Sequence, residues 1–282
     1  MVKAFLKQSF RRRSNPIPVE DIVLNYVWIN RAPFQPDISN KNAPLCGVPL
    51  ECVDNVILNA KRYPQTKVML WLDKSLLDDM SLFWVSSHIY NAGIKNVQIR
   101  DLAEIPSFRD NAVLFDWRRD ISKLAEKKAR TEDEKHNIWG RVDLARLLAV
   151  RHVLEEGAQY ALYTDFDNQE TFLDDPLMTQ KLLRNQMVYG LTRDKRKIFE
   201  NSYFAFGANI LKTGFLNEMI DETILDVGKG ENGYGAYYVH INHYTALSFL
   251  DYDGFELGFP AVAHPMGYKI PKPKEYQELG IN

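Results

Sequence analysis

Long apolar runs are absent from this chain. No stretch approaches the roughly 20 apolar residues that a membrane-spanning helix needs, and no apolar segment follows the charges in the basic start, residues 1–18. We therefore expect neither a transmembrane segment nor a secretory signal. Arg11, Arg12 and Arg13 favour a flexible, solvated arm over residues 1–20, with weak contact to acidic lipid or to a partner as the alternative.

The chain also contains few cysteines and has little net charge. Cys46 and Cys52 are too few for a disulfide framework and lack zinc-finger spacing, so we expect reduced thiols. The net charge is only -2, which gives no field that would attract nucleic acid. What is present, 45% hydrophobic and 26% charged residues, is ordinary for a soluble enzyme. The 282 residues can bury a large core, and we expect a single domain over 21–282.

Short apolar runs alternate with segments of helical spacing along most of the chain. The expected strands lie at 22–29, 68–72, 97–99, 160–163, 187–191 and 202–206. The expected helices lie at 50–63, 76–91, 138–156, 215–227 and 239–250, and Gly228 to Gly235 is expected to form a loop. This alternation predicts an α/β sheet covered by helices on both faces, in which ligands bind at the carboxyl ends of strands.

Two carboxylates follow directly after the buried strand expected at 160–163. Asp165 and Asp167 are costly to leave unpaired at such a place, and a cation relieves that cost. Mg²⁺ and Mn²⁺ prefer hard oxygen ligands and commonly bind one or two carboxylates together with substrate phosphates. The pattern therefore favours a metal site for a nucleotide diphosphate, with an ordinary surface turn as the alternative.

Two further features belong to the same expected edge of the sheet. Asp143 and Arg146 share one face of the apolar helix 138–156, where they form either an ion pair or a polar pocket. Arginine suits oxygen-rich ligands because its planar donors are fixed in a fork. Trp28 ends the first expected strand and is either a core residue or a platform for a nucleobase.

Four short segments, taken in order, resemble one enzyme family. They are 26–29 (Tyr-Val-Trp-Ile), 70–73 (Leu-Trp-Leu-Asp), 143–146 (Asp-Leu-Ala-Arg) and 163–167 (Tyr-Thr-Asp-Phe-Asp). Together they resemble the glycosyltransferases with a sugar-binding Asp-x-Asp motif, which include the catalytic domains of the large clostridial glucosylating toxins and related bacterial effectors. The resemblance implies a GT-A fold, with a mixed, mostly parallel sheet flanked by helices. It also implies retaining transfer of a hexose or N-acetylhexosamine from a UDP-sugar.

The resemblance implies a role for each matching residue on the donor side. Asp167 would bind Mn²⁺ or Mg²⁺ directly, and Asp165 would contact the ribose and the sugar, or the metal through water. Asp143 and Arg146 would hold sugar hydroxyls, and Trp28 would stack on the uracil. The catalytic group implied in this way is Asp143, Arg146 and Asp165.

Further along the chain, the resemblance implies roles for two more residues. Asn201 matches a family asparagine near the acceptor side, and His264 would supply a late metal ligand. His240 and His243 compete for that role, and for each of the three a solvated or satisfied histidine is the alternative. The acceptor implied by the effectors is a host protein, and the place of action is the cytoplasm or a host cell.

Two departures from the family pattern leave other functions open. Val142 stands where the family has a small residue, and no tryptophan follows Trp139 to form the toxins' Ser-x-Trp lid. One alternative is therefore a transferase-like module that binds a protein or a membrane without catalysis. The other is a phosphohydrolase with Asp165 as nucleophile, although that class carries its Asp-x-Asp motif near the start of the domain.

Overall fold

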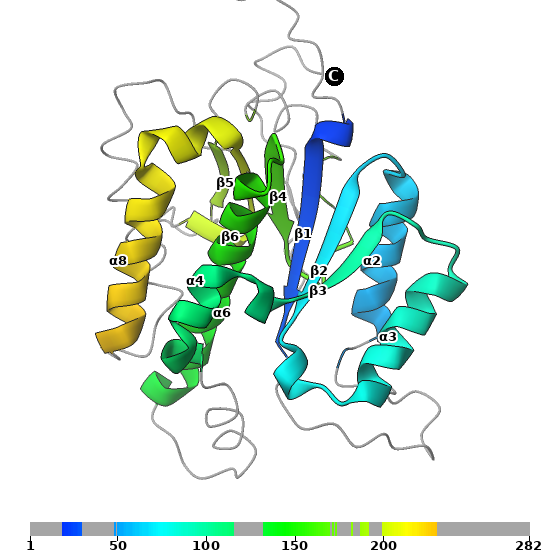
Figure 1. Ribbon diagram of the computed structural model, residues 1–282, viewed down its shortest axis with the longest axis horizontal. Coiled ribbons are helices and arrows are strands. Elements are labelled where there is room, and N and C mark those ends of the chain that lie inside the picture. The colour runs from blue at the N-terminus through cyan, green and yellow to red at the C-terminus, as the bar shows by residue number, and fades with distance from the viewer. Residues whose placement is uncertain are drawn as a thin grey trace, which may run out of the picture.

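The structure of the chain is a computed structural model (Figure 1), and it describes residues 19–29, 48, 50–115, 132–169, 171, 173, 182, 187–191 and 199–229. The strands are β1 (Ile22–Trp28), β2 (Lys67–Leu72), β3 (Val97–Asp101), β4 (Tyr160–Thr164), β5 (Met187–Leu191) and β6 (Phe199–Gly207). The α-helices are α2 (Leu50–Arg62), α3 (Asp79–Asn91), α4 (Pro106–Asp110), α6 (Glu132–Glu155) and α8 (Phe215–Lys229). Short 3₁₀ turns lie at Val19–Asp21, Lys74–Leu76, Leu102–Glu104, Ala112–Phe115 and Ala208–Thr213.

The six strands form one sheet in the order β3-β2-β1-β4-β6-β5. The pairs β3–β2, β2–β1 and β1–β4 are parallel, whereas β6 runs antiparallel to both β4 and β5. The sheet is therefore mixed and mostly parallel, and it is flanked by helices, as predicted. In this arrangement the carboxyl ends of β1 and β4 lie side by side. The antiparallel strand β6 begins at this same end of the strands.

Helices cover both faces of the sheet (Figure 1). Residues that alternate along β1 belong to two separate cores: Val23 and Val27 pack with α6 and α8, whereas Leu24 and Tyr26 pack with α2 and α3. Strands that are buried on both faces must be apolar almost throughout, because successive side chains point to opposite sides. This is why β1, β2 and β4 were visible as continuous apolar runs. All six predicted strands are present.

The ends of the helices follow from local chemistry. Gly93 and Gly157 have φ angles of 74° and 104°, the left-handed conformation that glycine allows just beyond a helix end. Helix α3 begins at Asp79 instead of residue 76, because the Asp78 carboxylate accepts a hydrogen bond of 2.6 Å from the backbone N–H of Ser81.

Two further predicted boundaries were wrong. Helix α6 begins at Glu132, earlier than residue 138; the charged segment 116–135 was expected to form a separate solvated helix or helical hairpin, and its residues 132–135 belong to α6. Gly228 lies inside α8 and not in the predicted loop. The rest of that loop, the predicted helix 239–250 and most of the arm 1–20 fall outside the described residues, so the arm-and-domain division stays a prediction.

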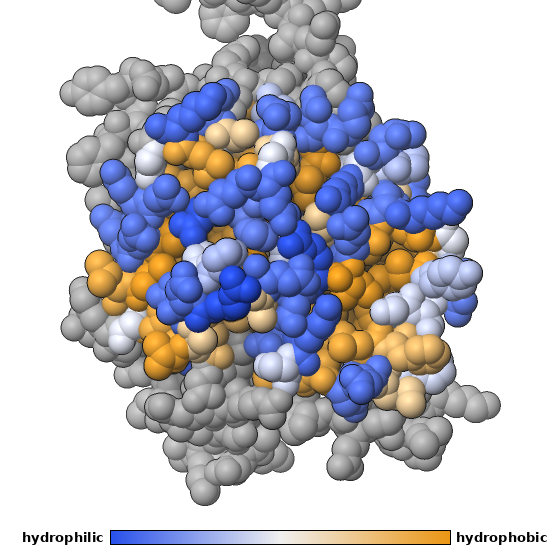
Figure 2. Space-filling model, in the orientation of Figure 1, coloured by the Kyte–Doolittle hydropathy of each residue, from blue (hydrophilic) through white to orange (hydrophobic). Residues whose placement is uncertain are grey.

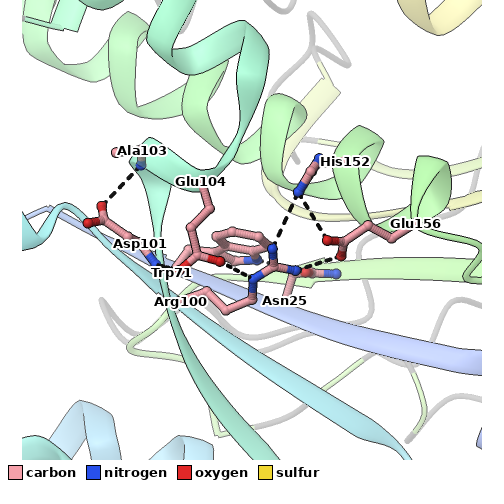
Figure 3. A network of polar contacts seen from close by, with 8 residues as sticks. All are labelled: Asn25, Trp71, Arg100, Asp101, Ala103, Glu104, His152 and Glu156. Atoms are coloured by element: carbon pink, nitrogen blue, oxygen red, sulfur yellow. Dashed lines mark hydrogen bonds and ion pairs between the residues drawn. The ribbon is translucent and has the colours of Figure 1, made fainter.

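A polar network fastens the edge strand β3 to the end of α6 (Figure 3). The Arg100 guanidinium lies over the Trp71 ring, 4.6 Å from its centre, and its Nε donates to Glu104 at 2.7 Å. Its Nη1 donates to Glu156, which also lies 3.2 Å from His152 Nε2. Stacking and ion pairing together hold the arginine in one place. None of the helices in the described ranges is both long and apolar enough to cross a bilayer.

Candidate functional site

The candidate site lies where the carboxyl ends of β1 and β4 meet. Asn25 of β1 pairs with Tyr163 of β4 in parallel register, so Trp28 and the turn after Thr164 emerge at the same edge. Helix α6 crosses the opposite face of these strands from α2 and packs on both β1 and β4. The predicted donor-side residues Trp28, Asp143, Arg146, Asp165 and Asp167 therefore come from three elements that meet at the carboxyl ends of these strands. Parallel α/β sheets bind ligands at this position.

Arg146 joins two carboxylates at this edge. Its Nη1 lies 3.0 Å from Asp143 Oδ1 and its Nη2 lies 2.8 Å from Asp165 Oδ1. The exposed fractions of the three side chains are 13% for Arg146, 4% for Asp143 and 13% for Asp165. Charge-assisted hydrogen bonds are strong in such a water-poor setting. The expected helical ion pair is thus one half of a bridge that reaches from α6 to the end of β4.

Tyr163 also binds the Asp165 carboxylate. Its hydroxyl donates a hydrogen bond of 2.8 Å to Asp165 Oδ1, and its ring lies under the Arg146 guanidinium at 5.1 Å. The ring also stacks on Phe204, with centroids 5.1 Å apart. Burial raises the pKa of Tyr163 well above its usual value, and the Asp165 charge acts in the same sense while Arg146 opposes it. The phenol therefore stays protonated and acts as a fixed donor.

Phe166 separates the two aspartates of the motif. Its ring is buried on the face of the sheet that α2 and α3 cover. There it packs against Trp28 and Tyr26 of β1, with ring centroids 5.4 Å and 6.3 Å away. Its backbone carbonyl accepts a hydrogen bond of 3.4 Å from Asn55 Nδ2 of α2. Asp165 is consequently held against α6. The other carboxylate of the motif, Asp167, follows Phe166 and is exposed.

The first turn of α2 lies near Asp167. Burial raises the pKa of the Cys52 thiol to about 12, and the Asp167 charge is the next largest cause of that shift. Cys52 is therefore a protonated, buried thiol, as expected from its context.

A divalent cation fits the donor set at this edge. Asp167 offers an exposed carboxylate, and Asp165 keeps a second oxygen beside the one that Arg146 and Tyr163 bind. Within the described ranges, no three His, Cys, Asp or Glu side chains gather closely enough for an all-protein metal site. Mg²⁺ and Mn²⁺ need no such cluster, because substrate phosphates and water complete their octahedral shells.

The remaining predicted residues have different outcomes. Trp28 is half-buried, with its ring tilted by 38° to that of Phe166. Asn201 lies in β6, two residues before Tyr203, which pairs with Thr164, so its backbone is at the site edge. His264 lies outside the described residues, as do His240 and His243.

Tyr163, Asn55 and Cys52 were not predicted as part of the site. For Tyr163 a signal was present: in extended chain, residues two apart point to the same side, which places the Tyr163 ring beside Asp165. Asn55 and Cys52 lie near residues 165–167 only because α2 packs on the sheet. A local sequence pattern does not predict such a long-range contact.

Comparison with known proteins gives no match to a protein-family description or to a curated protein. Three of the similar solved structures are transferases. The PaToxG glycosyltransferase has 15% identity over 89% of this chain and 78% of its own, with a TM-score of 0.48. A transferase with two cysteine-to-serine substitutions has 14% identity over 89% and 96%, with a TM-score of 0.43. A protein described as a nucleotide-diphospho-sugar transferase from Desulfovibrio desulfuricans G20 has 8% identity over 85% and 79%, with a TM-score of 0.41.

Proposed function

We propose that this chain is a metal-dependent, retaining glycosyltransferase that moves a hexose or N-acetylhexosamine from a UDP-sugar to an acceptor. One observation carries the proposal: Arg146 bridges Asp143 and Asp165 beside the exposed carboxylate of Asp167. The bridge sets fixed hydrogen-bonding groups next to a place where a cation and a diphosphate can lie.

The bridged half of the site suits a sugar. Carboxylates accept hydrogen bonds from hydroxyl groups, and a guanidinium donates to hydroxyl or ring oxygens. Arg146 and Tyr163 fix the orientation of Asp165, so its second oxygen needs little reorganisation when a sugar binds. As the bond to the diphosphate breaks, positive charge develops on the sugar ring, and the carboxylates of Asp143 and Asp165 stabilise that charge.

The exposed half suits the leaving group. Asp167, with the free side of Asp165, would hold Mn²⁺ or Mg²⁺. When bound, the cation would neutralise the charge that gathers on the departing diphosphate. Helix α2 contacts this turn through Asn55, whose side chain donates to the backbone carbonyl of Phe166 at 3.4 Å.

Trp28 would hold the nucleobase. Its ring is braced by Phe166 on one side and is half-exposed, so a flat uracil has a rigid surface on which to stack. Phe166 lies between Asp165 and Asp167 in the chain and contacts Trp28, so one side chain would connect the base-binding residue to the metal-binding turn. Asn201, at the start of β6, would face the acceptor, which the family resemblance suggests is a host protein.

Nucleotide release tests the proposal. Purified chain is incubated with UDP- and GDP-sugars and Mn²⁺, and free UDP or GDP is measured. We expect release from at least one UDP-sugar, loss of release in EDTA, and at least a 100-fold loss in Asp167→Asn, because cation binding would fail. Asp221→Asn, an exposed aspartate of α8, is the matched control and should keep full activity.

Two results would overturn the proposal. Undiminished release by Asp167→Asn would separate the carboxylate from the chemistry. Absence of UDP and metal binding in calorimetry would favour the non-catalytic binding module. The phosphohydrolase alternative is disfavoured, because Asp165 Oδ1 already accepts hydrogen bonds from Arg146 and Tyr163, which lowers its strength as a nucleophile. The anomeric configuration of a labelled product, read by NMR, tests retention.

A further inference from the structure

Helix α3 carries a large apolar surface on its outer face. Met80, Phe83, Trp84 and Tyr90 are exposed by 54%, 59%, 39% and 81%. The Phe83 and Trp84 rings contact each other edge to face, with centroids 5.7 Å apart. In Figure 2, apolar surface gathers at the lower right, over α3 and its neighbours. Single exposed apolar residues are ordinary on protein surfaces, whereas contiguous aromatic ones mark interaction sites.

These residues form a regular stripe, not a random scatter. Met80, Phe83, Ser87 and Tyr90 follow the three- and four-residue spacing that places side chains along one line of a helix. The opposite side of α3, with Ser81, Val85 and Ile89, is buried against the domain. Ser87 stands at the middle of the stripe and is small, so another helix can approach closely there.

The two ends of α3 carry opposite charge. Asp78 and Asp79 are exposed at its start. Lys95 is exposed just after its end, where Asn96 donates a hydrogen bond of 3.1 Å to the carbonyl of Ala60 and so ties this turn to α2. Exposed Lys61, in the last turn of α2, adds to the basic end. An apolar stripe with one acidic and one basic end is complementary to a copy of itself turned by 180°.

We propose that a second copy of this chain docks on α3, so that two α3 helices pack antiparallel about a twofold axis near Ser87. The acidic start of each helix then lies beside the basic end of the other, and the two helix dipoles also oppose each other favourably. Such a contact is isologous and closed, the commonest symmetry among soluble oligomers. This inference is independent of the proposed transferase activity.

The stripe is smaller than the interface of a stable dimer and fits a weak, reversible one. With aromatic side chains presenting on the order of 200 Å² each, the exposed parts of Phe83, Trp84 and Tyr90 amount to roughly 350 Å². A stable interface covers about 800 Å² per partner, so Met80 and the charged helix ends must contribute the rest. We expect a dissociation constant on the order of micromolar.

A lipid surface fits the stripe less well. Helices that lie on membranes carry lysine and arginine along the polar face. The segment 79–91 contains neither residue, and Asp78 and Asp79 at its start would face anionic headgroups. Binding to membranes is therefore treated as a competing outcome of the test.

Sedimentation velocity of the full chain from 1 to 100 μM tests the dimer. We expect the wild type to shift from monomer to dimer over this range, and Phe83→Asp to stay monomeric. The control is Leu225→Asp, which changes a residue of α8 with 61% exposure and should dimerise like the wild type. Circular dichroism checks that each variant is folded. A monomeric wild type at 100 μM, or equal effects of the two variants, would refute the proposal.

Two further measurements test the geometry. Asp79→Lys should weaken the dimer at least threefold, and adding Lys95→Asp should restore it; failure to restore contradicts the antiparallel pairing. Under mild oxidation, Ser87→Cys should give at least five times more disulfide-linked dimer than Ser86→Cys, because only position 87 lies on the stripe. Equal cross-linking contradicts the proposed axis. A monomer that co-sediments with phosphatidylserine vesicles would replace the dimer with a membrane surface.

Discussion

Arg146 Nη2 lies 2.8 Å from Asp165 Oδ1, and this contact links a helix to the turn that follows a strand. Because the same guanidinium also binds Asp143, it balances a carboxylate that is only 4% exposed. The arginine therefore has two roles that can be measured separately. It supports the fold by compensating a buried charge, and it orients the carboxylate proposed to face the sugar.

Replacing Arg146 should damage stability as well as activity. Arg146→Met leaves the buried Asp143 carboxylate without its guanidinium, which costs about 3–5 kcal/mol. Arg146→Lys keeps a charge but not the fork, so activity should fall more than stability. Urea denaturation measures the first effect and nucleotide release the second. Arg109→Met is the control, because Arg109 is exposed on α4 and its replacement should cost about 0.5 kcal/mol or less.

Tyr163→Phe should slow turnover without unfolding the chain. The substitution removes the hydrogen bond to Asp165 but keeps the ring between Arg146 and Phe204. A hydrogen bond to a charged group contributes about 1.5–3 kcal/mol, which corresponds to roughly a 10- to 150-fold loss. We expect the loss in kcat more than in KM. Tyr160→Phe, on the same strand, is the control, and equal effects of the two variants would argue against the orienting role.

Trp28→Ala should weaken nucleotide binding. Stacking of a base on an aromatic ring contributes about 1–3 kcal/mol, so the affinity for UDP should fall 5- to 150-fold, whereas Trp28→Phe should recover much of it. Titration calorimetry in the presence of Mn²⁺ measures the effect. Trp84→Ala, on the surface of α3, should leave UDP affinity unchanged. Unaltered affinity in Trp28→Ala would return this residue to a purely structural role.

Acid should destabilise the fold in two steps at the Arg100 network. Burial lowers the pKa of His152, with Arg100 acting in the same sense and Glu156 and Glu155 opposing. At pH values between the lowered pKa of folded His152 and the ordinary histidine pKa near 6.5, the unfolded chain binds more protons than the folded chain. The free energy of unfolding therefore falls as the pH drops from about 7. The hydrogen bond from Arg100 lowers the pKa of Glu156, which adds a second loss below the ordinary value of 4.5.

Thermal unfolding between pH 4 and 8 measures both steps. His152→Gln should flatten the dependence above pH 5, while the step below pH 4.5 remains. His88→Gln is the control, because His88 lies at the surface beside Asp54. A profile for His152→Gln that matches the wild type would show that His152 does not control the upper step.

Much of the fold was predictable because it rests on local patterns. Strands such as β4 were visible as short apolar runs, and Gly157 marked the end of α6. The grouping of Asp143, Arg146 and Asp165 also followed from the sequence, since helix spacing and the end of a strand fix where each lies. Their binding of a sugar stays a prediction, as does the role of Asp167.

Other features depend on contacts that no local pattern encodes. Arg100 and Glu156 are far apart in the sequence, and their ion pair exists only because β3 and the end of α6 meet in three dimensions. The exposed stripe of α3 was hidden for a different reason. A helix that is apolar on most sides, as α3 is, does not reveal from periodicity alone which side faces solvent.

The bridge formed by Arg146 has a consequence for how the site assembles during folding. Asp143, Arg146, Tyr163 and Asp165 all come from α6 and β4, which follow each other through the short turn at Gly157. Contacts of such low sequence separation lose little chain entropy on closure and tend to form early. Trp28 joins them only when β1 pairs with β4 across the chain. The sugar-facing half of the site should therefore form earlier during folding than the base-facing half.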